Sequence, residues 1–70
     1  MESKEDLLMQ LGMRIKQCRK QKGISQLQLA HLVQKDQQSI QRLESGKVNP
    51  SYYYLMEICT GLDIDIKEFF

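Results

Sequence analysis

Apolar residues recur along this chain with the period of an α-helix, and short polar turns separate the helical stretches. In residues 5–22 they return at intervals of three or four, at Leu8, Leu11, Ile15 and Cys18. Such intervals place side chains on one face of a helix. Gly23 predicts the end of this helix, because glycine readily adopts the left-handed backbone that closes a helix. We expect the polar residues 1–4 to be frayed.

Four shorter helices are predicted downstream. Each follows a residue whose side chain can accept a hydrogen bond from the first turn, namely Ser25, Asp36, Ser51 and Asp65. Gln28 and Glu68, three residues after the first and last of these, would complete reciprocal capping boxes. The fourth helix should run to about Leu62. The residues expected to face inward are Leu29, Ala30, Val33, Ile40, Leu43, Tyr52, Leu55, Ile58, Cys59, Leu62, Ile66 and Phe69.

No stretch alternates with period two for long, so no strand is expected. The pattern predicts an all-α fold, a compact five-helix bundle that forms a single domain over residues 1–70. A chain of 70 residues buries a limited core and benefits from tight packing or a dimer partner.

Residues 25–46 have the layout of a helix-turn-helix. Two short helices are joined by a turn at Gln34 and Lys35, and Gly46 ends the second helix. In this motif the second helix enters the major groove of DNA. Its predicted exposed face carries Gln37, Gln38, Gln41 and Arg42. The layout therefore favours sequence-specific DNA binding.

The charge distribution supports an anion-facing surface. The net charge is only +1, but between Leu7 and Met56 there are eight basic and two acidic residues, which gives a local charge of +6. The other acidic residues lie toward the two ends of the chain. A basic middle between acidic ends suits binding to DNA, although solvated helix faces can produce the same pattern.

Other function classes have little support. Cys18 and Cys59 form no metal-binding pair and sit at apolar helical positions, and His31 is the single histidine. We expect no metal site, no cofactor and no catalytic residues, because no nucleophile–base set is present. No apolar run approaches a membrane span, and the acidic N-terminus lacks a signal pattern, so we expect a cytoplasmic protein.

The order and spacing of several short motifs carry a family resemblance. They are Arg19, Gly23-Ile24-Ser25-Gln26, Leu29-Ala30, Ile40, Leu43-Glu44-Ser45-Gly46, Asn49-Pro50-Ser51, Leu62-Asp63-Ile64-Asp65-Ile66 and Phe69-Phe70. From about Leu11 onward the chain resembles the Cro/C1-type (XRE-family) helix-turn-helix domain, which has a lambda repressor-like fold. Gln37-Gln38-Ser39-Ile40 is also similar to the recognition helix of the phage 434 repressor. Gln34 and Asp63 depart from the family, which commonly has glycine at these two positions.

The resemblance implies roles for individual residues at the DNA. Gln37 and Gln38 would read the outer base pairs of a half-site, an adenine among them, since a glutamine amide can pair with adenine N6 and N7. Gln41 and Arg42 would reach an inner base pair or a phosphate. The backbone phosphates would be contacted by Gln26, Lys47 and Asn49.

Arg19 and Glu44 have a different implied role, because the resemblance pairs them as a structural ion pair between the first and third helices. Tyr52, Tyr53 and Tyr54 are unusual as a run. The first is expected to pack, while the other two could cover the fourth helix or contribute to a dimer contact.

The sequence thus predicts a transcriptional regulator from a bacterium or phage. It would bind double-stranded DNA as a homodimer on a pseudo-palindromic operator, and would act as a repressor, with activation equally open. The alternative is a protein-interaction module, such as an antitoxin or a coactivator bridge. A pure interaction module has no reason to expose the glutamines of the third helix.

Overall fold

The computed structural model describes residues 2–70 and is helical throughout its regular structure. Its elements are α1 (Lys4–Gln21), α2 (Gln26–Leu32), α3 (Gln37–Glu44), α4 (Tyr52–Leu62) and the 3-10 helix η1 (Ile66–Phe69). The all-α prediction is confirmed. The fifth element is a single 3-10 turn, and Asp65 accepts a hydrogen bond from the N–H of Lys67 at 2.9 Å, so the capping box predicted with Glu68 does not form.

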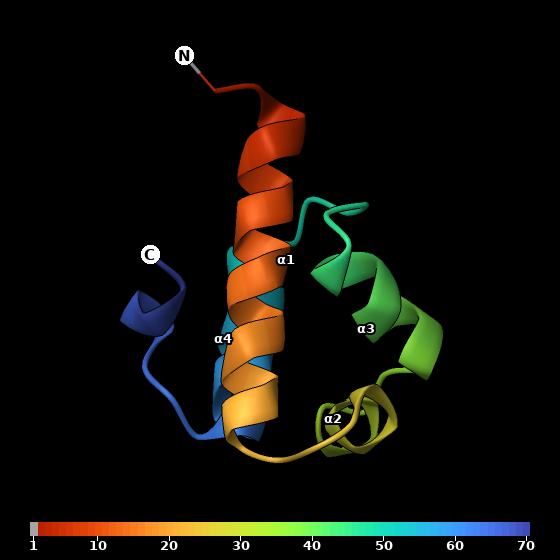
Figure 1. The fold of residues 1–70 in the computed structure, drawn as a ribbon. Coiled ribbons are helices and arrows are strands. Elements are labelled where there is room, and N and C mark those ends of the chain that lie inside the picture. The colour runs from red at the N-terminus through yellow and green to blue at the C-terminus, as the bar shows by residue number, and fades with distance from the viewer. Residues whose placement is uncertain (1) are drawn as a thin grey trace.

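The elements surround one core (Figure 1). The long helix α1 has α3 packed on one side and η1 on the other, while α2 packs against both α3 and α4. The buried apolar side chains come from every element: Ile15, Leu29, Ala30, Val33, Ile40, Leu43, Leu55, Ile58, Cys59, Leu62 and Phe69. Both α2 and α3 keep an outer surface that is exposed to solvent. None of the helices within residues 2–70 is both long and apolar enough to cross a bilayer.

The start of α1 corrects one prediction. Residues 3 and 4 are not frayed, because the Oγ of Ser3 accepts a hydrogen bond from the N–H of Asp6 at 3.1 Å and α1 begins at Lys4. Met1, also predicted to be frayed, lies outside the described residues. The polar composition of residues 1–4 predicts a frayed tail, but the spacing of Ser3 to the acidic first turn is that of an N-cap.

The turns use the backbone conformations that their sequence implies. Gly23 and Gly46 both have φ of +74° and follow α1 and α3. Gln34 and Asp63 adopt φ of +58° and +56°, the left-handed region in which the family resemblance places glycine. Each keeps the turn at a cost in strain, because a β-carbon is disfavoured there.

One inward-facing prediction for α4 is wrong. Tyr52 is 66% exposed, and the tyrosine that turns toward the core is Tyr54. Side chains of a helix lean toward its N-terminus, so a residue in the first turn projects beyond the start of the helix. Tyr52, at the first position of α4, therefore projects away from the core although its spacing to Leu55 is that of an inner residue. Leu8 is only half-buried, because the start of α1 extends past α3.

Candidate nucleic-acid interface

The outer face of α3 is polar and open to solvent. The side chains of Gln37, Gln38, Gln41 and Arg42 are all exposed, whereas Ile40, Leu43 and Glu44 are buried on the opposite face. Gln37, Gln38 and Gln41 line one shallow hollow together with Gln26 from α2. Four amide side chains, each with donors and an acceptor, thus converge where the two motif helices meet.

Arg42 lies beside this amide cluster and also reaches a second hollow. It is four residues after Gln38, so the two side chains are on adjacent turns of the same helix face. The second hollow is lined by Arg42 and Ser39 from α3, by Asn49 from the loop and by residues of α4. Lys47 is exposed in the same loop, and its N–H bonds to the Arg42 carbonyl at 3.0 Å. Of the predicted contact residues, Gln26, Gln37, Gln38 and Gln41 thus line one hollow, Arg42 and Asn49 line the second, and Lys47 lines neither.

A buried ion pair fixes α3 to α1. The Nε of Arg19 donates to Glu44 at 2.6 Å and its second terminal nitrogen donates at 3.0 Å, with side chains only 8% and 2% exposed. The remaining terminal nitrogen of Arg19 donates to the Ile24 carbonyl at 2.8 Å. This bidentate geometry sets both the position and the rotation of α3 relative to α1.

Gln26 belongs to the same network. Its side-chain amide donates to an oxygen of Glu44 at 3.1 Å, a contact that sequence spacing did not indicate. The bond uses one of the two amide hydrogens and leaves the other, together with the amide oxygen, available at the surface. Gln26 is thus held beside the glutamines of α3 before any DNA arrives.

The close approach of α1 to α3 depends on Gly12. A β-carbon at this position would lie 2.5 Å from the carbonyl oxygen of Glu44 and 2.7 Å from that of Leu43. Both atoms belong to the backbone of α3 and cannot rotate away. The missing side chain therefore lets α1 pack directly against the end of the helix that carries the glutamines.

The side chain of Lys35, in the motif turn, is held by residues of α4. Its ammonium lies 3.5 Å from a carboxylate oxygen of Glu57 and 5.3 Å from the ring centroid of Tyr54. Both partners come from α4, so part of the positive charge in the basic middle of the sequence ties the motif to α4. This use of Lys35 could not be predicted from its position in the turn.

Asp36 caps the start of α3, as the sequence predicts. Its carboxylate accepts from the N–H of Ser39 at 2.7 Å, and this backbone hydrogen bond holds the pKa of the carboxyl below its ordinary value of 3.8. A lowered pKa means that the ionised carboxylate stabilises the fold and that this contribution is lost as pH falls through the folded-state pKa.

We therefore expect the wild-type protein to have a higher free energy of unfolding than an Asp36→Asn variant near neutral pH, and this difference to shrink as pH falls below about 4 and the carboxylate is protonated. Asparagine keeps the capping oxygen but does not titrate in this range. Urea unfolding of both proteins between about pH 7 and pH 3 measures the difference. A difference that is constant across this range would show that the carboxylate charge contributes nothing to the cap.

The described residues show no cluster that could hold a metal ion. The thiols of Cys18 and Cys59 are free, and burial raises the pKa of both. His31 is exposed on α2. The outer face of α3 offers hydrogen-bonding amides and positive charge, which suit a ligand with many hydrogen-bond acceptors.

Comparisons with known proteins agree with this geometry. A family model described as HTH_3, helix-turn-helix, matches residues 15–69. The solved structure of the restriction-modification controller protein C.AhdI from Aeromonas hydrophila is 32% identical, with a TM-score of 0.93, over 99% of this chain and 100% of that one. A search of curated proteins found no match.

Two further solved structures share the fold. The clp gene regulator ClgR from C. glutamicum is 24% identical, with a TM-score of 0.86, over 90% of this chain and 82% of that one. An HTH_3 family transcriptional regulator from Vibrio cholerae is 25% identical, with a TM-score of 0.89, over 97% of this chain and 38% of that one.

Proposed function

We propose that this chain, which belongs to the HTH_3 family of helix-turn-helix proteins and is a DNA-binding transcriptional regulator, reads a pseudo-palindromic operator through α3. The resemblance to Cro/C1-type domains is thereby confirmed. The observation that carries the proposal is the outer face of α3, where exposed amide and guanidinium groups stand on a helix whose inner face is fixed by a buried ion pair.

Base reading is assigned to this outer face. Gln37 and Gln38 begin α3, and the start of the second motif helix is the part that meets base edges. Each glutamine amide can pair with adenine, and Arg42 can pair with guanine or a phosphate. Gln41 lies between Gln37 and Arg42 on the exposed side and would contact an inner base pair.

Phosphate contacts would set the position of the protein along the duplex. Gln26 is held at the start of α2, where unpaired N–H groups and the helix dipole favour an anion. Lys47 and Asn49 lie in the loop after α3 and are exposed. These groups carry no sequence information, but they fix the register in which α3 meets the bases.

The regulator would act as a homodimer and repress by occluding a promoter, in the cytoplasm of a bacterium or in the host of a phage. A two-fold dimer matches two half-sites about one helical turn, or roughly 34 Å, apart. The controller function named for the C.AhdI protein, which is similar over 99% of this chain, supports a regulatory role.

The salt dependence of binding to random-sequence duplex tests DNA binding before any operator is known. The logarithm of the binding constant should fall linearly with the logarithm of salt concentration, with a slope of about −0.9 for each phosphate neutralised. A Lys47→Ala variant should show a shallower slope than the wild-type protein. Salt-independent binding, or none, would contradict the proposal and favour a protein-interaction module.

A further inference from the structure

A carboxylate lies at the edge of the surface assigned to base reading. Asp36 directly precedes Gln37 and Gln38 and is the N-cap of α3, the helix whose start meets base edges in this motif. Its side chain is exposed to solvent. Unlike the two amides that follow it, an ionised carboxylate only accepts hydrogen bonds. Asp36 therefore gives this edge a chemical character that the glutamines do not have.

The cap leaves part of the Asp36 carboxylate free. Ser39 bonds to it through its N–H, at 2.7 Å from Oδ1, and the Ser39 hydroxyl also helps to hold the pKa of the carboxyl below 3.8. The group is thus ionised near neutral pH. A carboxylate has about four acceptor positions, and Ser39 is its one hydrogen-bond donor within residues 2–70. A DNA base can therefore donate to Asp36 while α3 remains capped.

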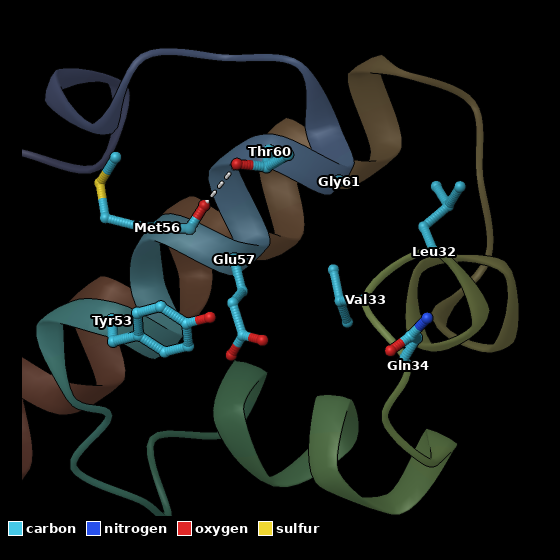
Figure 2. A pocket seen from close by; sticks show the side chains of 8 residues that line it. All are labelled: Leu32, Val33, Gln34, Tyr53, Met56, Glu57, Thr60 and Gly61. Carbon is cyan, nitrogen blue, oxygen red and sulfur yellow. Dashed lines mark hydrogen bonds between the residues drawn. The ribbon is translucent and has the colours of Figure 1, made fainter.

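The preceding lysine does not neutralise Asp36. The ammonium of Lys35 lies 3.5 Å from a carboxylate oxygen of Glu57 and 5.3 Å from the ring centroid of Tyr54. Figure 2 shows Glu57 projecting from α4 toward the motif, at a hollow of about 340 Å³ that Tyr53 also lines. No ion pair among residues 2–70 includes Asp36. An unpaired carboxylate beside DNA is repelled by the phosphates, so it is unfavourable there unless a base supplies a donor.

We propose that Asp36 is a specificity-determining residue, which accepts a hydrogen bond from the N4 amino group of a cytosine next to the base pairs read by Gln37 and Gln38. The inference rests on the proposed function, because it requires α3 in the major groove. In that groove cytosine presents a donor and no acceptor, whereas guanine presents two acceptors and thymine an acceptor and a methyl group.

Adenine is disfavoured for a related reason. It has an amino donor at N6, but its N7 acceptor lies beside that donor and repels a carboxylate. Asp36 thus selects cytosine in two ways, by the bond that it forms with N4 and by repulsion from the acceptors of the other bases. The same negative charge that would weaken binding to an arbitrary sequence thereby contributes to discrimination.

Three capping side chains at position 36 provide a matched series. Asp36→Asn and Asp36→Ser both keep an oxygen that can cap α3, and both remove the same charge. With its oxygen on the cap, asparagine turns a donor amide outward, whereas serine has no second polar atom. Asp63→Asn is the control for charge, because Asp63 is exposed at the end of α4 and lines neither hollow beside α3. Circular dichroism verifies that each variant is folded.

Selection of bound sequences from a random duplex pool, at one salt concentration, measures the base preference of each protein. The wild-type protein and Asp63→Asn should enrich cytosine at one position of each half-site, beside the outer adenines, by about fivefold or more over the other bases. Asp36→Ser should have no preference at this position. Asp36→Asn should favour a base that presents acceptors, with guanine the strongest. The other positions should be the same in all four proteins.

The selection separates this inference from the proposed function. A wild-type protein that enriches a palindrome without this cytosine would overturn the role of Asp36 alone, and so would a cytosine that persists in Asp36→Asn and Asp36→Ser. A change of affinity that is equal for every sequence in these two variants would show that Asp36 acts only as a cap. A folded wild-type protein that enriches no sequence would instead overturn the proposed function.

Discussion

Replacing Glu44 with alanine should lower the free energy of unfolding by about 3 to 5 kcal/mol. Glu44 is 6% exposed as a residue and accepts two hydrogen bonds from Arg19 and one from Gln26. Alanine removes all three acceptors and strands the guanidinium of Arg19 in a nearly dry site. The charge left without a partner, more than the lost attraction, produces the destabilisation.

The effect is measured by urea and thermal unfolding. In a domain of this size each kcal/mol lowers the melting temperature by about 4 to 8 °C, so the shift should be large. Glu57→Ala provides the control, since its pair with Lys35 is partly exposed and its loss should cost about 1 kcal/mol or less. Equal losses in the two variants would show that the buried pair contributes no more than a surface pair.

A double variant separates the pair from its two members. Arg19→Met combined with Glu44→Leu removes both charges and both hydrogen-bonding ends together, so no charge is stranded. The double variant should lose less free energy of unfolding than the sum of the losses in Arg19→Met alone and in Glu44→Leu alone, because the two residues are in direct contact. Additive losses would mean that each side chain stabilises the fold independently of the other.

Replacing Gln38 with alanine should weaken binding to a specific half-site by about 1 to 3 kcal/mol, or roughly 5- to 150-fold. The side chain is exposed at the start of α3 and makes no hydrogen bond within residues 2–70 that would be lost on substitution. Binding to random DNA should be nearly unchanged, because non-specific affinity comes from phosphate contacts.

Titration of a labelled operator and of a random duplex, at one salt concentration, measures both affinities. Gln17→Ala, an exposed glutamine of α1 outside the amide cluster, is the matched control and should alter neither. Equal weakening on both duplexes in Gln38→Ala would contradict base reading by this residue. If Gln38→Ala prefers the operator over the random duplex as strongly as the wild-type protein does, the bases must be read by other side chains of α3.

Features that depend on neighbouring residues in the sequence could be predicted. Ser25, Asp36 and Ser51 cap their helices because each side chain bonds to a backbone N–H three residues on, at 2.7 to 3.0 Å. The family resemblance predicts the turns at Gln34 and Asp63, and both residues have positive φ. Local geometry decides these features, so the sequence contains the information directly.

Features that depend on packing between distant elements could not be predicted. The bond from Gln26 to Glu44 joins residues 18 apart, and only the crossing of α2 and α3 brings them together. Tyr52 is exposed because α4 begins at this residue, and where the helix begins relative to the core was not evident from its spacing to Leu55. The hollow beside Tyr53 likewise exists only because α4 and the motif turn meet around it.

The central claim, that α3 reads DNA sequence as part of a dimer, is tested most directly by selecting bound sequences from a random duplex pool near physiological salt. We predict an enriched palindrome with adenines at the outer half-site positions and half-sites about one helical turn apart. Gln38→Ala should lose the preference at one of these positions. A folded protein that enriches no sequence would contradict the account.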